Sequence, residues 1–104
     1  MPIDPKIIEE AKAKGDEITQ FSQDGIEVLV KPPTRPQWKR FRALIADEKR
    51  RPDALEQLLR DCLVYPGLTD LDAILEKKPG LAESFGGSLV ELAGLSDRVE
   101  KKVL

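Results

Sequence analysis

Six basic side chains near the middle of the chain are candidates for binding a partner, because of their charge and their spacing. Three of them recur at steps of four and three residues, which places them in one row along a helix. The other three stand together a short distance further on. The sequence therefore gives as candidate partner-binding residues Arg35, Lys39, Arg42, Lys49, Arg50 and Arg51.

The charge of the chain is concentrated in one segment. Residues 31–51 contain eight basic and two acidic side chains, a sum of +6, so the remainder carries −8 of the net −2. The row of cations in this segment is either a solvated helix face or a docking surface for an acidic partner. Nucleic acid is a weaker interpretation, because the sequence pI is about 5.2 and the nearby Trp38 and Phe41 are expected in the core.

Other residue types that could support chemistry are few. The chain has no histidine and one cysteine, Cys62, which falls on an apolar helix stripe. We therefore predict no catalytic residue, no metal ligand and no cofactor, and we expect a core thiol. Asp70 and Asp72, beside a predicted helix cap at Thr69, are explained by favourable charge in a first helical turn. The glycine-rich residues 84–88 lack the spacing of a phosphate-binding loop.

The positions of these residues depend on a single globular domain, expected over residues 17–95. Residues 1–16 are expected to form an N-terminal arm or a short helix, with Asp4 as its cap and Gly15 at its exit. Strands near 17–22 and 26–31 form a predicted hairpin, since Asp24-Gly25 favours a tight turn. Two short strands leave open edges, so we also expect weak self-association.

A compact bundle of about four helices should follow, over residues 34–95. Thr34 and Gln37 have the spacing of a capping box, and Gly86-Gly87 could let another helix approach closely. Ile45 is placed on the apolar face of the first long helix, and residues 96–104 form a charged tail. The fold class is mainly α, with these side chains mostly buried: Trp38, Phe41, Leu55, Leu58, Leu59, Cys62, Leu63, Ile74, Leu75, Leu81, Phe85, Leu89 and Leu92.

We expect neither a membrane-spanning segment nor an export signal in this sequence. Its longest apolar run, residues 26–30, is interrupted by Glu27 and is far shorter than the ~18 residues of a spanning helix. The first residues lack a basic flank followed by an apolar stretch. We expect no membrane contact and a location in a reducing cytoplasm.

Three segments in this order resemble one known family. They are residues 33–42 (PTRPQWKRFR), residues 54–66 (ALEQLLRDCLVYP), and a run from Leu71 to Gly94 that contains Pro79-Gly80-Leu81-Ala82. Together with the preceding hairpin they resemble the tail assembly chaperones of long-tailed bacteriophages and prophages. The likeness spans roughly residues 17–95.

The resemblance implies a non-enzymatic role in the cytoplasm of the bacterial host. Such chaperones bind the long tape measure protein, keep it soluble, and help to recruit the tail tube protein. Two alternatives remain open at this point. One is a small nucleic-acid-binding regulator that uses the basic segment 31–51, and the other is a generic protein-interaction adaptor.

Overall fold

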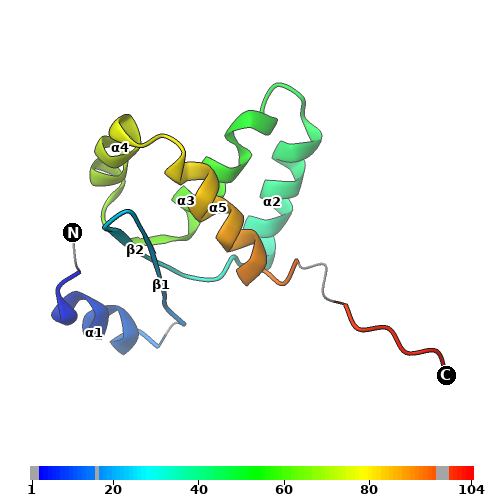
Figure 1. Cartoon of the computed structure of the whole chain (residues 1–104), viewed down its shortest axis with the longest axis horizontal. Helices are drawn as coiled ribbons and strands as arrows, with labels where there is room; N and C mark the ends of the chain where they lie inside the picture. Colours follow the sequence, from blue (N-terminus) through cyan, green and yellow to red (C-terminus); the bar gives the residue numbers. More distant parts are fainter. Residues whose placement is uncertain (1–2, 16, 96–98) are drawn as a thin grey trace.

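The protein is mainly α, with one small antiparallel sheet (Figure 1). The structure, a computed structural model, describes residues 3–15, 17–95 and 99–104. The predicted mainly α class is confirmed. The elements, in chain order, are α1 (Pro5–Ala13), β1 (Thr19–Gln23), β2 (Ile26–Val30), α2 (Arg35–Ala46), the 3-10 turn η1 (Arg51–Asp53), α3 (Ala54–Cys62), β3 (Leu63–Tyr65), α4 (Leu68–Lys77) and α5 (Leu81–Leu92).

The sheet differs from the expected hairpin by one strand. Its order is β1-β2-β3, and β3 pairs with β2 through Leu29↔Tyr65 and Val30↔Leu63, with an irregularity between those two pairs. Leu63, expected within the helical bundle, instead begins β3, because α3 ends at Cys62. A strand of three residues is too short to show the two-residue alternation that identifies strands in a sequence.

The hairpin itself follows from its turn residues. Asp24 and Gly25 both have positive φ, at 53° and 78°, which is the backbone of a type I′ turn. The turn sets an unbroken register of five pairs, from Gln23↔Ile26 to Thr19↔Val30. Successive side chains of β2 therefore point to opposite faces of the sheet.

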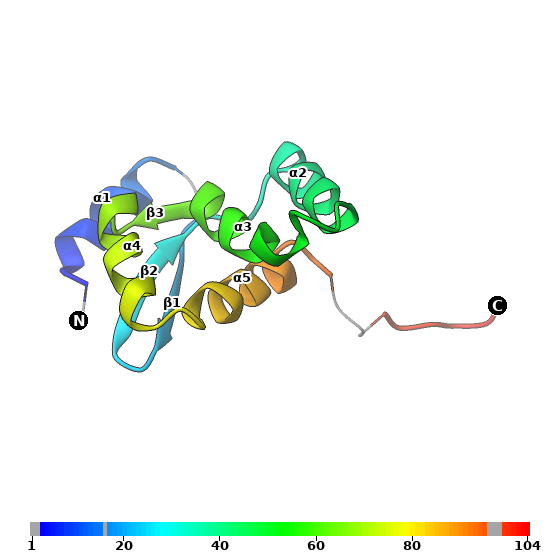
Figure 2. The same cartoon turned by 90° about the horizontal axis from the view of Figure 1, so that it is seen from above.

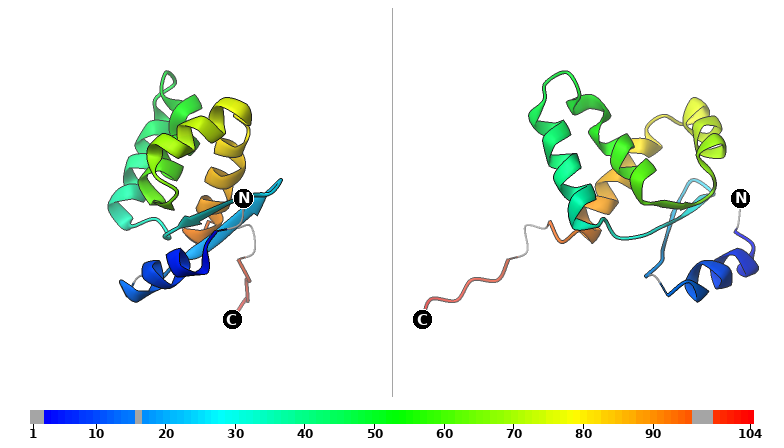
Figure 3. Two further views of the ribbon diagram at one scale, coloured as in Figure 1. Left: turned by 90° about the vertical axis from the view of Figure 1, so that its left-hand side faces the viewer. Right: turned by 180° about the vertical axis from the view of Figure 1, so that it is seen from behind.

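The main core lies on one face of this sheet, beneath α2–α5 (Figures 2 and 3). Val28 and Val30 point into it, and Phe21 stacks on Phe85 with ring centroids 6.0 Å apart. All thirteen side chains predicted to be mostly buried belong to this cluster. Seven are buried, and six are partly buried at its margin: Trp38, Leu55, Leu63, Ile74, Leu75 and Leu92.

Helix α1 covers the opposite face of the sheet (Figure 3, left). Its segment, expected as an arm or a short helix, forms a helix that buries Ile3 and Ala11 against Leu29. Asp4 caps it by accepting the backbone N–H of Lys6 at 2.9 Å. The chain leaves α1 through Gly15, whose φ is +83°.

Two local assignments were wrong. Helix α4 begins at Leu68 with Gly67 as its N-cap, so Thr69 lies inside the first turn and caps nothing. Only Pro66 and Gly67 separate β3 from α4, so the helix has already begun when the chain reaches residue 69. Ile45, placed on the apolar face of α2, is 41% exposed.

Helix α5 packs closely on α3 through a glycine, as the sequence suggested. A Cβ atom at Gly86 would lie 2.7 Å from the backbone oxygen of Leu55, whereas one at Gly87 would meet nothing within 4 Å. Gly94, at a φ of +97°, ends the helix. Of the predicted tail, residues 96–98 lie outside the described residues, and residues 99–104 are exposed. Within the described ranges, no helix is long and apolar enough to cross a membrane.

Candidate protein-binding surface

The row of cations predicted from the sequence lies on the outer side of α2. Phe41 and Leu44 turn inward to the main core. Arg35, Lys39 and Arg42 are all exposed, and helical spacing puts them on the side of α2 opposite these two residues. We call these three residues the basic face.

The charges of the basic face are not neutralised by any residue that the structure describes. Among the residues that the structure describes, none of its three side chains forms an ion pair or a hydrogen bond. Arg40, on the same helix, behaves differently, because its guanidinium lies 3.5 Å from the Asp61 carboxylate. The basic face therefore keeps three cations free to meet an anionic surface.

The remaining three candidates lie at the other end of α2. Lys49 and Arg50 are exposed in the turn after Asp47, whose carboxylate accepts the backbone N–H of Lys49 at 3.0 Å. Arg51 donates from Nε to the backbone oxygen of Ile45 at 2.6 Å, so it satisfies the last turn of α2. The structure thus splits the six candidates into the basic face and a separate basic turn.

An apolar row that the residue pattern did not predict borders the basic face. Trp38 and Ile45 are seven residues apart and so lie on the same side of α2, next to Arg42. Trp38 is partly buried beside Phe41, at a ring-centroid distance of 5.2 Å, while Ile45 is 41% exposed. A helical-wheel projection of α2 centred on Phe41 and Leu44 places Ile45 at the edge of the buried stripe, where partial exposure is expected.

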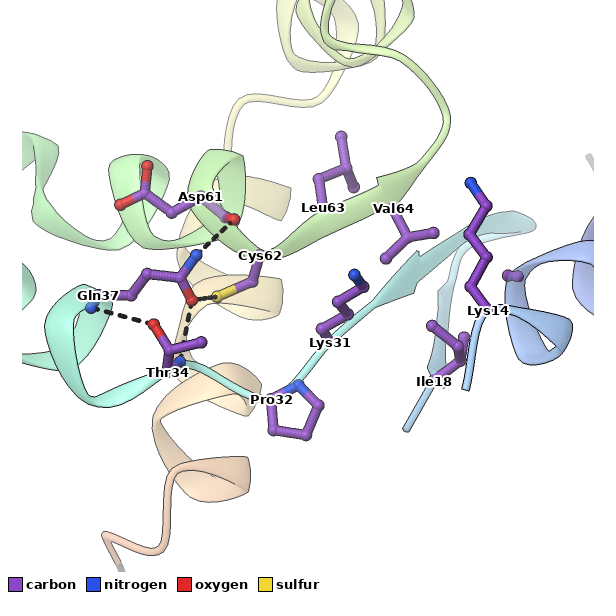
Figure 4. Close-up of a pocket in the computed structure, with 11 residues that line it drawn as sticks. Lys14, Ile18, Lys31, Pro32, Thr34, Gln37, Asp61, Cys62, Leu63 and Val64 are labelled. Atoms are coloured by element: carbon purple, nitrogen blue, oxygen red, sulfur yellow. Dashed lines mark hydrogen bonds between the residues drawn. The ribbon is translucent and has the colours of Figure 1, made fainter. Parts of the chain in front are cut away.

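One side chain fixes the start of α2 to the end of α3 (Figure 4). Thr34 accepts the Gln37 backbone N–H at 3.3 Å, and Gln37 Oε1 accepts that of Thr34 at 2.9 Å, which confirms the predicted capping box. Gln37 Nε2 also donates to the backbone oxygen of Asp61 at 3.0 Å, and Cys62 Sγ donates to Gln37 Oε1 at 3.6 Å. The basic face is therefore held on a fixed scaffold.

A cavity of about 310 Å³ lies beside this junction, between α1, β3 and the start of α2. Lys14 and Lys31 line it together with Cys62 (Figure 4). Burial, and secondarily the Asp61 charge, raise the pKa of the Cys62 thiol to about 11. The thiol is therefore protonated and inert at neutral pH, which agrees with the core role predicted for it.

The acidic residues of α4 have a structural use. Asp72 accepts a hydrogen bond from Arg60, which also pairs with Glu56 at 3.3 Å. The hydrogen bond to Asp72 is the main reason why the pKa of Arg60 is raised above its ordinary value. Asp72 thus ties α4 to α3, while Asp70 lies in the first turn of α4 as expected. In the described part of the chain, no three Cys, Asp or Glu side chains are grouped as a metal site.

Comparison with known proteins identifies a similar fold and the family of this chain. A solved structure of an uncharacterised protein from Bacillus stearothermophilus superposes with a TM-score of 0.77 at 23% sequence identity, covering 91% of this chain and 99% of that chain. A search among curated proteins gives no significant match. The family model described as "Domain of unknown function (DUF6848)" matches residues 15–102. Because that match covers most of its length, the chain belongs to the DUF6848 family.

Proposed function

We propose that this protein is a non-enzymatic tail assembly chaperone, which binds a phage tape measure protein and keeps it soluble in the bacterial cytoplasm. The observation that carries the proposal is the basic face of α2, three unpaired cations bordered by an apolar row. The likeness of residues 17–95 to that chaperone family supplies the identity of the partner. Recruitment of the tail tube protein is part of the same proposal.

The surface suits a long amphipathic helix as its partner. Trp38 and Ile45 offer apolar area, and the adjacent cations can pair with acidic side chains on the polar edge of that helix. Each exposed ion pair contributes only about 0.2–1 kcal/mol, so one copy binds weakly and the apolar row must supply much of the affinity. Many copies along one long chain would then cover its apolar stripe.

The test is co-expression with a tape measure protein, with the soluble fraction of that protein as the measurement. The wild-type protein should keep it soluble. Arg35→Glu, Lys39→Glu and Arg42→Glu together should lower that soluble fraction, because they reduce the affinity of the complex at least about tenfold. The matched control reverses three exposed lysines on α1 and α4, Lys6→Glu, Lys12→Glu and Lys77→Glu. It makes the same change in net charge and should leave the complex intact.

Two results would count against the proposal in different ways. Equal losses from both triple variants would mean that net charge, and not the basic face, governs binding. Failure of the wild-type protein to bind any tail protein would remove the chaperone function itself. Ile45→Asp adds an independent measurement, since it changes the apolar row without touching a cation.

A further inference from the structure

Strand β1 has an open outer edge. It is the first strand in the order β1-β2-β3, and within the described residues no other strand pairs with it. The pair that flanks a two-residue hairpin turn is hydrogen-bonded, and bonded pairs then alternate along the strands. Thr19, Phe21 and Gln23 therefore direct their backbone groups toward β2. Gln20 and Ser22 direct theirs outward.

The devices that normally protect a sheet edge are missing from β1. Its sequence, Thr-Gln-Phe-Ser-Gln, has no charge and no proline, and its register with β2 is continuous over five pairs. The opposite edge is protected in three ways, since β3 has only three residues, pairs irregularly with β2, and runs directly into Pro66. The two edges of one sheet thus differ sharply in their capacity to pair.

We propose that β1 pairs antiparallel with β1 of a second copy of this chain, about a two-fold axis at Phe21. In that register Gln20 faces Ser22 of the second copy and Ser22 faces its Gln20. Each of these two pairs exchanges both backbone hydrogen bonds, through the groups that point outward in the single chain. The two three-stranded sheets become one continuous sheet.

The side chains favour a second copy as the occupant of this edge. No charge is placed opposite a like charge, because the strand has none. Phe21 is only partly buried on Phe85, and in the dimer it meets Phe21 of the second copy at a non-bonded pair, where side chains approach most closely. The remaining exposed surface of both rings is covered. Four backbone hydrogen bonds and two rings make a small interface, so the dimer is weak and depends on concentration.

Gly86 of α5 is not available as an alternative contact between two copies of the chain. Gly86, which the sequence offered as a place for another helix, is already occupied by Leu55 of α3. The dimer forms without any tail protein, so the proposal of a dimer can be tested independently of the proposed chaperone function.

The experiment is sedimentation equilibrium of the full chain over a roughly hundredfold concentration range. Wild-type protein should change from monomer to dimer across that range. Ser22→Pro removes an outward N–H that β2 does not use, and should give a monomer throughout with an unchanged circular dichroism spectrum. Ser22→Lys should weaken the dimer at least about tenfold, because an edge lysine opposes pairing. Ser84→Lys, on an exposed position of α5, should dimerise as wild type does.

Amide hydrogen exchange identifies the surface. Exchange at Gln20 and Ser22 should slow as concentration rises, because their outward N–H groups become hydrogen-bonded in the dimer. A wild-type protein that is monomeric throughout would overturn the proposal. So would a dimer that survives both Ser22 variants, since it would be formed by another surface. Should Ser22→Pro fail to fold, Ser22→Lys against Ser84→Lys still decides the matter.

Discussion

The two faces of strand β2 are buried to the same degree by very different means. Val28 and Val30 are 0% exposed within a cluster to which four helices contribute, while Leu29, at 1%, is covered by α1 and the residues around it. Burial of a single side chain thus says little about how much structure depends on it. We expect the main core to unfold as one unit, and the α1 face to open separately at lower free energy.

The largest effect should come from the centre of the main core. Leu59 is 0% exposed, so Leu59→Ala removes buried methyl groups and leaves a cavity, at a cost of roughly 2–5 kcal/mol in unfolding free energy. Denaturant unfolding followed by fluorescence of Trp38, the only tryptophan, measures it. A cost below about 0.5 kcal/mol would show that the main core is not the cooperative unit assumed here.

Substitution of two adjacent glycines in α5 should give the next largest effect on stability, with one position serving as the control for the other. Gly86→Ala would put a Cβ 2.7 Å from the Leu55 backbone oxygen, so α3 and α5 must separate. We expect a loss of about 1–3 kcal/mol, reduced by the better helix propensity of alanine. Gly87→Ala meets nothing within 4 Å and should gain up to about 1 kcal/mol. Losses of similar size at both positions would mean that flexibility, not close packing, requires these glycines.

The thiol at the end of α3 gives the main core a pH dependence. The pKa of Cys62 is about 11 in the folded protein against an ordinary value of 9. Between those values the unfolded chain loses a proton that the folded chain keeps, so stability must fall as pH rises. The loss reaches up to about 2.5 kcal/mol near pH 11.

Cys62→Ala isolates that contribution. The variant starts less stable, but between pH 9 and 11 its unfolding free energy should fall less steeply than that of wild type, because it has no thiol to titrate. Parallel curves would mean that titration of the thiol does not cause the alkaline loss of stability.

The main core could be predicted from the sequence because its information is local. Leu55, Leu58, Leu59 and Cys62 repeat at helical spacing, and Thr34 with Gln37 marks the start of α2 three residues apart. The turn at Asp24-Gly25 is equally local. Each of these features is fixed by neighbours in the chain, so one sequence was enough to find it.

What the sequence did not predict depends on contacts between distant segments. Strand β3 exists because residues 63–65 meet β2, and the packing of α1 depends on Leu29, far along the chain. The candidate surface shows the same division. The row of cations followed from spacing, but the exposure of Ile45 and the use of Arg51 at the end of α2 required the structure.

The smallest effect on the main core should come from the cap of α1, and it decides whether the two faces of the sheet unfold separately. Asp4 and Thr34 both accept a backbone N–H at the start of a helix, the first in α1 and the second in α2. Replacing either with alanine removes about 0.5–2 kcal/mol from its helix. Thr34→Ala should lower the denaturant midpoint reported by Trp38 fluorescence, since α2 belongs to the main core. Asp4→Ala should leave that midpoint in place and instead reduce helical circular dichroism before the main transition, because α1 opens first. Equal shifts of the Trp38 midpoint in the two variants would show that both faces of β2 unfold together, so that the α1 face is as much a part of the cooperative core as Leu59.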